Sequence, residues 1–110
     1  MLSESLELTQ GAGAPHHEAV AHRVSGLFYL EMGNMVEASK SLERAIDIAR
    51  ELGSRVELGR SNYAMAMAQL GDDDLEAART YASKAKTLFT ESRASRELAK
   101  TMKLIEQLDG

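Results

Sequence analysis

A single proline, Pro15, leaves the 95 residues that follow it in this 110-residue chain without an obligatory helix breaker. Ala, Leu and Glu fill 42 positions, whereas the β-branched residues Val and Ile fill only seven. Straight-chain residues and alanine favour helices, and a shortage of β-branched residues disfavours sheets. The sequence therefore predicts an all-α protein, and its length fits one domain.

Glycines divide the chain into segments with helical periodicity. Gly33, Gly53, Gly71 and Gly110 each follow such a segment, as is typical of residues that end helices. Because the connections are only a few residues long, neighbouring helices should run antiparallel. The expected helices cover residues 16–32, 35–52, 55–70, 75–91 and 94–108. Residues 1–15 are weakly patterned, and we expect a flexible tail followed by a helical domain over residues 16–110.

The segments repeat. Apolar residues recur along 35–52 at steps of three and four, and adding 40 to each position gives a second set in which five of six residues are apolar. The helices at 16–32 and 55–70 match at an offset of 38, which pairs Gly26 with Ala64 and Gly33 with Gly71. An offset of 39 leads from the helix at 55–70 to the last helix. We interpret this as an internal repeat of helix pairs with a period of 38–40 residues.

The residues of the first pair, Gly26-Leu27-Phe28-Tyr29 followed by Gly33, Ala38, Leu42 and Ala45, resemble the signature of the tetratricopeptide repeat (TPR) family in a long-period form. The resemblance covers about residues 19–91. It implies two antiparallel helical hairpins plus a C-terminal capping helix, arranged as a short right-handed solenoid. It also implies close crossings of small residues, with Gly26 against Ala38 and Ala45, and Ala64 against Ala78 and Ala85. Lys103 and Glu106 are charged where a following helix would pack, so we expect the last helix to be a solvated cap.

The sequence supports no catalytic or cofactor site. Cysteine is absent, which excludes disulfides and zinc–thiolate sites, and no serine stands in a nucleophile motif. His17 and His22 are five residues apart, whereas the helical zinc motif needs four. The acidic turn at 72–74 suits a helix N-terminus better than a calcium loop. We expect no enzyme activity, cofactor or metal. The alternative is a five-helix bundle that binds a small ligand or metal through His16, His17, His22 or the acidic turn.

Charge and hydropathy limit the partners. The formal net charge is -4, which argues against nucleic acid and anionic membranes. Residues 1–10 contain no Lys or Arg, and the longest uncharged apolar stretch, residues 63–70, is far shorter than the ~20 residues that span a bilayer. A cytoplasmic protein is the expectation.

The resemblance implies a non-catalytic protein–protein interaction scaffold with a concave groove for a partner peptide or helix, formed by the first helix of each pair. The alternative is that Leu27, Leu30 and Met65 merely fill a small core. A carboxylate clamp is not expected, because Glu97 would repel the ligand. Two and a half repeats are fewer than a stable solenoid usually needs, which favours a homodimer. The partner itself is unidentified. The groove residues are expected to be Arg23, Leu27, Leu30, Asn62, Met65, Gln69, Lys100 and Leu104.

Overall fold

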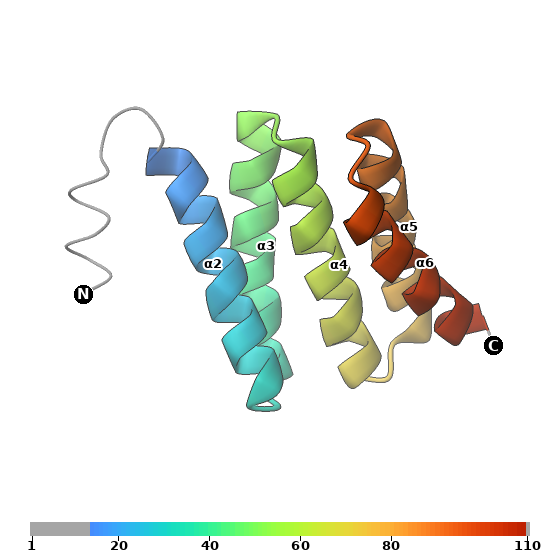
Figure 1. Ribbon diagram of the computed structural model, residues 1–110. Coiled ribbons are helices and arrows are strands. Elements are labelled where there is room, and N and C mark those ends of the chain that lie inside the picture. The colour runs from blue at the N-terminus through green and yellow to red at the C-terminus, as the bar shows by residue number, and fades with distance from the viewer. Residues whose placement is uncertain (1–13, 110) are drawn as a thin grey trace.

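Five helices form the part of the chain described by the computed structural model, residues 14–109 (Figure 1). Each expected helix is present, and every boundary lies within two residues of the predicted one, so the all-α repeat fold is confirmed. Among the described residues, no helix is long and apolar enough to cross a membrane. The helices are α2 (Ala14–Glu31), α3 (Met35–Leu52), α4 (Arg55–Gly71), α5 (Leu75–Glu91) and α6 (Ser95–Asp109).

The expected flexible tail and the expected capping helix lie at the two ends of the chain. Residues 1–13 and 110 lie outside the described residues, so for residues 1–13 the flexible tail stays a prediction. Ala14 and Pro15, which we also assigned to that tail, belong to α2. On α6, Lys103 and Glu106 are exposed, in agreement with a solvated face on the last helix.

Side-chain caps begin three of the helices. The side-chain oxygens of Asn34, Ser54 and Asp74 accept hydrogen bonds from the backbone N–H three residues later, at 3.3, 3.4 and 3.1 Å. Such caps satisfy donors that the first turn of a helix leaves free. Asp74 belongs to the acidic turn, so our interpretation of that turn as a helix N-terminus is confirmed.

Left-handed residues end the helices at a constant interval along the chain. Gly33, Gly53, Asp73 and Arg93 have φ angles of 79°, 70°, 60° and 57°. Gly33 and Gly53 thus end their helices as expected. Gly71 does not, because it is the last residue of α4 and Asp73 takes the left-handed position. These four residues are 20 positions apart, so one helix with its turn spans 20 residues and one hairpin spans 40 residues.

The helices form two layers. Figure 1 shows α2, α4 and α6 along one side of the molecule, with α3 and α5 behind them. One apolar cluster joins Leu42 and Ile46 of α3 to α4. A second joins α4 and α5 to α6 through Ala78, Ala82 and Leu104. Each helix thus packs on its neighbours in the chain, as in a solenoid.

The close crossing of α2 and α3 occurs at Gly26. A Cβ atom at this position would lie 2.5 Å from Cγ of Leu42 and 3.3 Å from the carbonyl oxygen of Ala38. This confirms Gly26 against Ala38; Ala45 is also buried, but Leu42 lies nearest to Gly26.

The crossing predicted for the second hairpin is wrong in register. The α4 residue that clusters with Ala78 and Ala82 is Ala66, whereas Ala64 belongs to the cluster with Leu42. Gly26 therefore corresponds to Ala66, at an offset of 40 instead of 38. The same offset that relates α3 to α5 holds for α2 and α4 as well.

Candidate functional site

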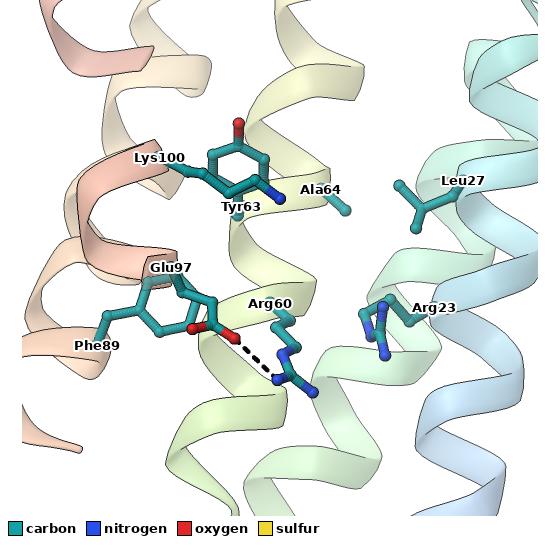
Figure 2. Close-up of a pocket in the computed structure, with 8 residues that line it drawn as sticks. All are labelled: Arg23, Leu27, Arg60, Tyr63, Ala64, Phe89, Glu97 and Lys100. Atoms are coloured by element: carbon teal, nitrogen blue, oxygen red, sulfur yellow. Dashed lines mark hydrogen bonds and ion pairs between the residues drawn. The ribbon is translucent and has the colours of Figure 1, made fainter. Parts of the chain in front are cut away.

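A hollow of about 280 Å³ opens on the α2, α4 and α6 layer, and we refer to it as the central hollow. Figure 2 shows side chains from α2 on one side and from α6 on the other, with α4 between them. Side chains of α2, α4 and α6, together with the side chain of Phe89 on α5, thus form its walls. The lining residues are Arg23, Leu27, Arg60, Tyr63, Ala64, Phe89, Glu97 and Lys100.

Ion pairs join the three helices around this hollow. Arg23 on α2 donates through two guanidinium nitrogens to both carboxylate oxygens of Glu57 on α4. One repeat further on, Arg60 donates from Nη2 to Oε2 of Glu97 on α6, at 2.8 Å. The two acceptors, Glu57 and Glu97, occupy the same position in successive repeats, so each joins its helix to the preceding one in the layer. Planar guanidinium–carboxylate pairs fix orientation as well as distance.

The two pairs differ in their exposure to solvent. The side chain of Glu57 is only 2% exposed, whereas that of Glu97 is 26% exposed. The hydrogen bond from Arg60 is the main cause that lowers the pKa of Glu97 below the ordinary value for a glutamate. Glu97 is therefore a carboxylate at neutral pH, and its charge is engaged by Arg60.

Lys100 is the remaining cation of the hollow. It is exposed on α6, one turn after Glu97, and it forms no ion pair with any residue of the described range 14–109. Leu27 and the half-buried ring of Tyr63 supply apolar surface in the same hollow. The hollow thus combines an apolar surface with one cationic group that has no ion-pair partner within residues 14–109.

The comparison with protein families agrees with the repeat geometry. A family model described as tetratricopeptide repeat matches residues 19–91, which is well over half of the chain. The chain belongs to the tetratricopeptide repeat family. Repeats of this family generally mediate protein–protein interactions, and the family is typically non-catalytic. Searches of curated proteins and of solved structures gave no match.

Three of the eight expected groove residues line the central hollow of this TPR chain. Arg23 and Leu27 reach it from α2, and Lys100 reaches it from α6. Arg23 is not free, because Glu57 already engages its guanidinium group. The side chain of Leu27 is 37% exposed and is available to a ligand.

The other five expected residues do not line the central hollow. Met65, Asn62 and Leu104 are buried, and Met65 and Leu104 lie in the two apolar clusters, so their placement in an exposed groove is wrong. Leu30 packs partly buried against the first cluster. Gln69 is half-buried and its amide contacts the sulfur of Met65 at 3.6 Å. For Met65 and Leu30, the alternative that they fill core is the one that the structure supports.

The offset explains the error at Met65. An offset of 38 pairs Leu27 with Met65, whereas the observed offset of 40 pairs it with Met67. Met67 is 36% exposed, almost the same as Leu27, and Met65 is completely buried.

The offset of 40 also pairs Arg23 with Tyr63 and Arg60 with Lys100. Sequence reasoning missed Arg60, Tyr63, Ala64 and Phe89 as lining residues, although the offset of 40 between the second helices was already visible.

A second hollow is more open than the central one. It measures about 420 Å³, lies between α3, α4 and α5, and is lined by Asn62 and Lys84 among others. The amide of Asn62 donates to the carbonyl oxygen of Leu58, so it is already engaged. No group of three or more potential metal ligands occurs within the part of the chain that the structure describes.

Proposed function

We propose that this TPR chain is a non-catalytic interaction module whose central hollow binds a segment of a partner protein. An apolar side chain of the partner lies against Leu27 and Tyr63, and an acidic group pairs with Lys100. The observation that carries this proposal is the combination, in one hollow, of apolar surface with a cation that has no ion-pair partner in residues 14–109.

The size of the hollow favours a peptide side chain over a small-molecule ligand. Its volume of about 280 Å³ lies just below that of pockets that enclose drug-sized ligands, which span roughly 300–1,000 Å³. One or two side chains of a partner fill such a volume, while the rest of the partner lies along the layer formed by α2, α4 and α6. Aromatic and arginine side chains, here Tyr63 and Arg60, are common in the central parts of protein interfaces.

The ion pairs support a binding role over a catalytic one. Arg23 and Arg60 are held by Glu57 and Glu97, and among the described residues no serine, threonine, cysteine or histidine lines the hollow. These pairs fix the spacing of α2, α4 and α6, so the hollow keeps its shape before a partner arrives. A preorganised surface loses less entropy on binding.

Selection from a random peptide library tests this proposal. We expect selected peptides to contain an apolar residue near an Asp or Glu. Their affinity, measured by calorimetry, should fall about tenfold or more for Leu27→Glu and for Lys100→Glu, because each change removes one of the two contacts. Lys86→Glu changes a lysine that is also exposed but lies on α5 outside the hollow; it is the matched control and should leave affinity unchanged.

A second selection makes the test sharper. Peptides selected against the Lys100→Glu protein should carry Lys or Arg where the first set carries acidic residues. The proposal fails if both sets have the same charge pattern, or if Lys86→Glu weakens binding as much as Lys100→Glu does.

A further inference from the structure

Helices α3 and α5 border a groove on the side of α4 that is opposite to the central hollow. Two hollows, of about 420 and 260 Å³, share the lining residues Arg50, Asn62 and Lys84, so they form one continuous groove, which we call the α3–α5 groove. Leu58 and Asn62 line it from α4, and each is two residues, or about 200° around the helix axis, from Arg60 of the central hollow. A ligand in the α3–α5 groove therefore leaves the central hollow accessible.

Two cations lie in this groove. Lys84 is exposed on α5 and forms no ion pair with any residue in the range 14–109. Its ammonium lies 5.4 Å from the centre of the Tyr81 ring, a contact that restrains the group but does not neutralise its charge. Arg50 on α3 has only an exposed pair with Asp47, at 3.5 Å, of a kind that contributes little to stability. Both cations can therefore pair with an acidic group of a ligand.

Asn62 is polar at a position where the repeat accepts an apolar residue. Its counterpart on α6, at the offset of 40, is Met102. Asn62 is only 4% exposed, and asparagine is a poorer helix former than methionine. Its Nδ2 donates one hydrogen to the carbonyl oxygen of Leu58, at 2.9 Å, and no described residue bonds the other hydrogen or Oδ1. One donor and one acceptor thus remain for a ligand, and they match the C=O and N–H of a peptide backbone.

Charge and hydropathy change along the groove. The half-buried Leu58 and Leu88 supply apolar surface at one end. Glu43 and Asp47 are acidic at the other end. Lys84 lies between the two ends, because it lines both hollows. The groove is therefore complementary to a segment with an apolar, an acidic and a basic group in that order.

We propose that the α3–α5 groove is a second docking site, which binds a peptide segment with an apolar, an acidic and a basic residue in this order or its reverse. The apolar side chain packs on Leu58 and Leu88. The acidic group pairs with Lys84, and the basic group pairs with Glu43. From Glu43 to Arg50 the groove runs about 10 Å along α3, the length of about three extended residues.

The two sites give the chain a bridging role that goes beyond the single site of the proposed function. They lie on opposite sides of α4, so two partners, or two segments of one partner, bind at the same time. A segment with one acidic and one basic residue carries no net charge, so the net charge of -4 on the chain does not repel it.

Peptide selection with a counter-screen tests this second site. From a random library, we retain peptides that bind the unaltered chain but not the Lys84→Glu protein. They should carry an apolar residue on one side of an Asp or Glu and a Lys or Arg on the other. Their affinity, measured by calorimetry, should fall about tenfold or more for Lys84→Glu. Lys86→Glu should leave it unchanged, because Lys86 is also exposed on α5 but lines none of the three hollows.

Independence of the two sites separates this proposal from the proposed function. The retained peptides should bind the Lys100→Glu protein with unchanged affinity, and they should not compete with peptides that bind the central hollow. Failure of the central hollow appears in the Lys100→Glu measurement, whereas failure of the α3–α5 groove appears in the Lys84→Glu measurement.

Asn62→Met distinguishes a role in binding from a role in folding. The thermal midpoint should be unchanged or higher, because methionine already occupies this position on α6 and favours helices. The affinity for the retained peptides should fall about threefold or more, because the amide contacts are lost. A lower midpoint with unchanged affinity would overturn the assignment of Asn62 to the ligand.

Three outcomes would overturn the second docking site. In the first, no peptide distinguishes Lys84→Glu from Lys86→Glu. In the second, the retained peptides compete with those of the central hollow. In the third, the chain sediments as a dimer that Lys84→Glu dissociates and Lys86→Glu does not; a second copy then occupies the groove. Circular dichroism of the Lys84→Glu protein should match that of the unaltered chain, since Lys84 is exposed.

Discussion

At the scale of single residues, the most demanding feature is the carboxylate of Glu57 in the interior. Its side chain is 2% exposed and depends on Arg23, which is 18% exposed, for its ion pair. A buried charge needs a partner with good geometry, and loss of that partner costs far more than the net contribution of the intact pair. The pair therefore makes α2 and α4 depend on each other although α3 separates them in the chain.

Replacement of Arg23 should reveal this dependence. Arg23→Ala leaves Glu57 buried without its partner, and we expect the free energy of unfolding to fall by about 3–5 kcal/mol, measured by urea denaturation followed by circular dichroism. Lys40→Ala removes an exposed pair with Glu37 and should cost less than about 1 kcal/mol. Equal losses in the two variants would show that Glu57 does not need Arg23.

The exposed pair at Glu97 makes a contribution that depends on pH. Its pKa is lowered, chiefly by the hydrogen bond from Arg60, so the folded state binds a proton less readily than the unfolded state. The resulting stability is fully present above the unfolded pKa of a glutamate and is lost as the pH falls through the lower, folded pKa.

We expect Glu97→Gln to be less stable than the unaltered protein at pH 7 and to lose this difference in acid, in urea titrations between pH 7 and pH 3. In an Arg60→Ala protein, the carboxyl carbon of Glu97 should titrate at a higher pH, as measured by NMR. A stability difference that is the same at every pH would contradict the assignment.

At the scale of the helices, the contact between α2 and α3 depends on the absence of a side chain at Gly26. A Cβ there would lie 2.5 and 2.7 Å from two atoms of Leu42, which is completely buried. Gly26→Ala should therefore lower the free energy of unfolding by about 1 kcal/mol, because overpacking costs about 1–3 kcal/mol and the better helix propensity of alanine offsets part of it.

Gly71→Ala is the control for this prediction. The added Cβ would meet the terminal methyl of Met35 at 2.5 Å, but this flexible side chain is half-buried and can move away. We expect its thermal unfolding midpoint to be unchanged or slightly higher, while that of Gly26→Ala falls. If both variants melt alike, the α2–α3 crossing is looser than the structure indicates.

At the scale of the whole molecule, contacts are made mainly between successive helices, so local damage should stay local. Leu104 on α6 packs in the cluster with Ala78 and Ala82. Leu104→Ala should speed hydrogen exchange in α6 and in the part of α5 that it contacts, while the amides of α3 keep their original rates. Equal acceleration in every helix would show instead that the chain unfolds as one cooperative unit.

The sequence by itself determined the helices and the presence of a repeat of helix pairs. These features depend on residues close together in the chain: the apolar periodicity of 35–52, the acidic turn at 72–74 and the glycines at 33 and 53. Local interactions decide them, so they can be read without knowing which helices meet. The family resemblance also rested on such local patterns, and the family match over residues 19–91 agrees with it.

Only the tertiary structure decided which side chains face the central hollow. Each helical residue turns by about 100°, so an offset of 38 in place of 40 rotates the assigned position by roughly 200° around the axis. That difference moves the assignment from exposed Met67 to buried Met65. The true offset became visible through contacts between distant residues, such as Gly26 with Leu42 and Ala66 with Ala82. Sequence periodicity predicts that a helix has an apolar face, but packing against α3 and α5 determines which residues of α4 lie between them.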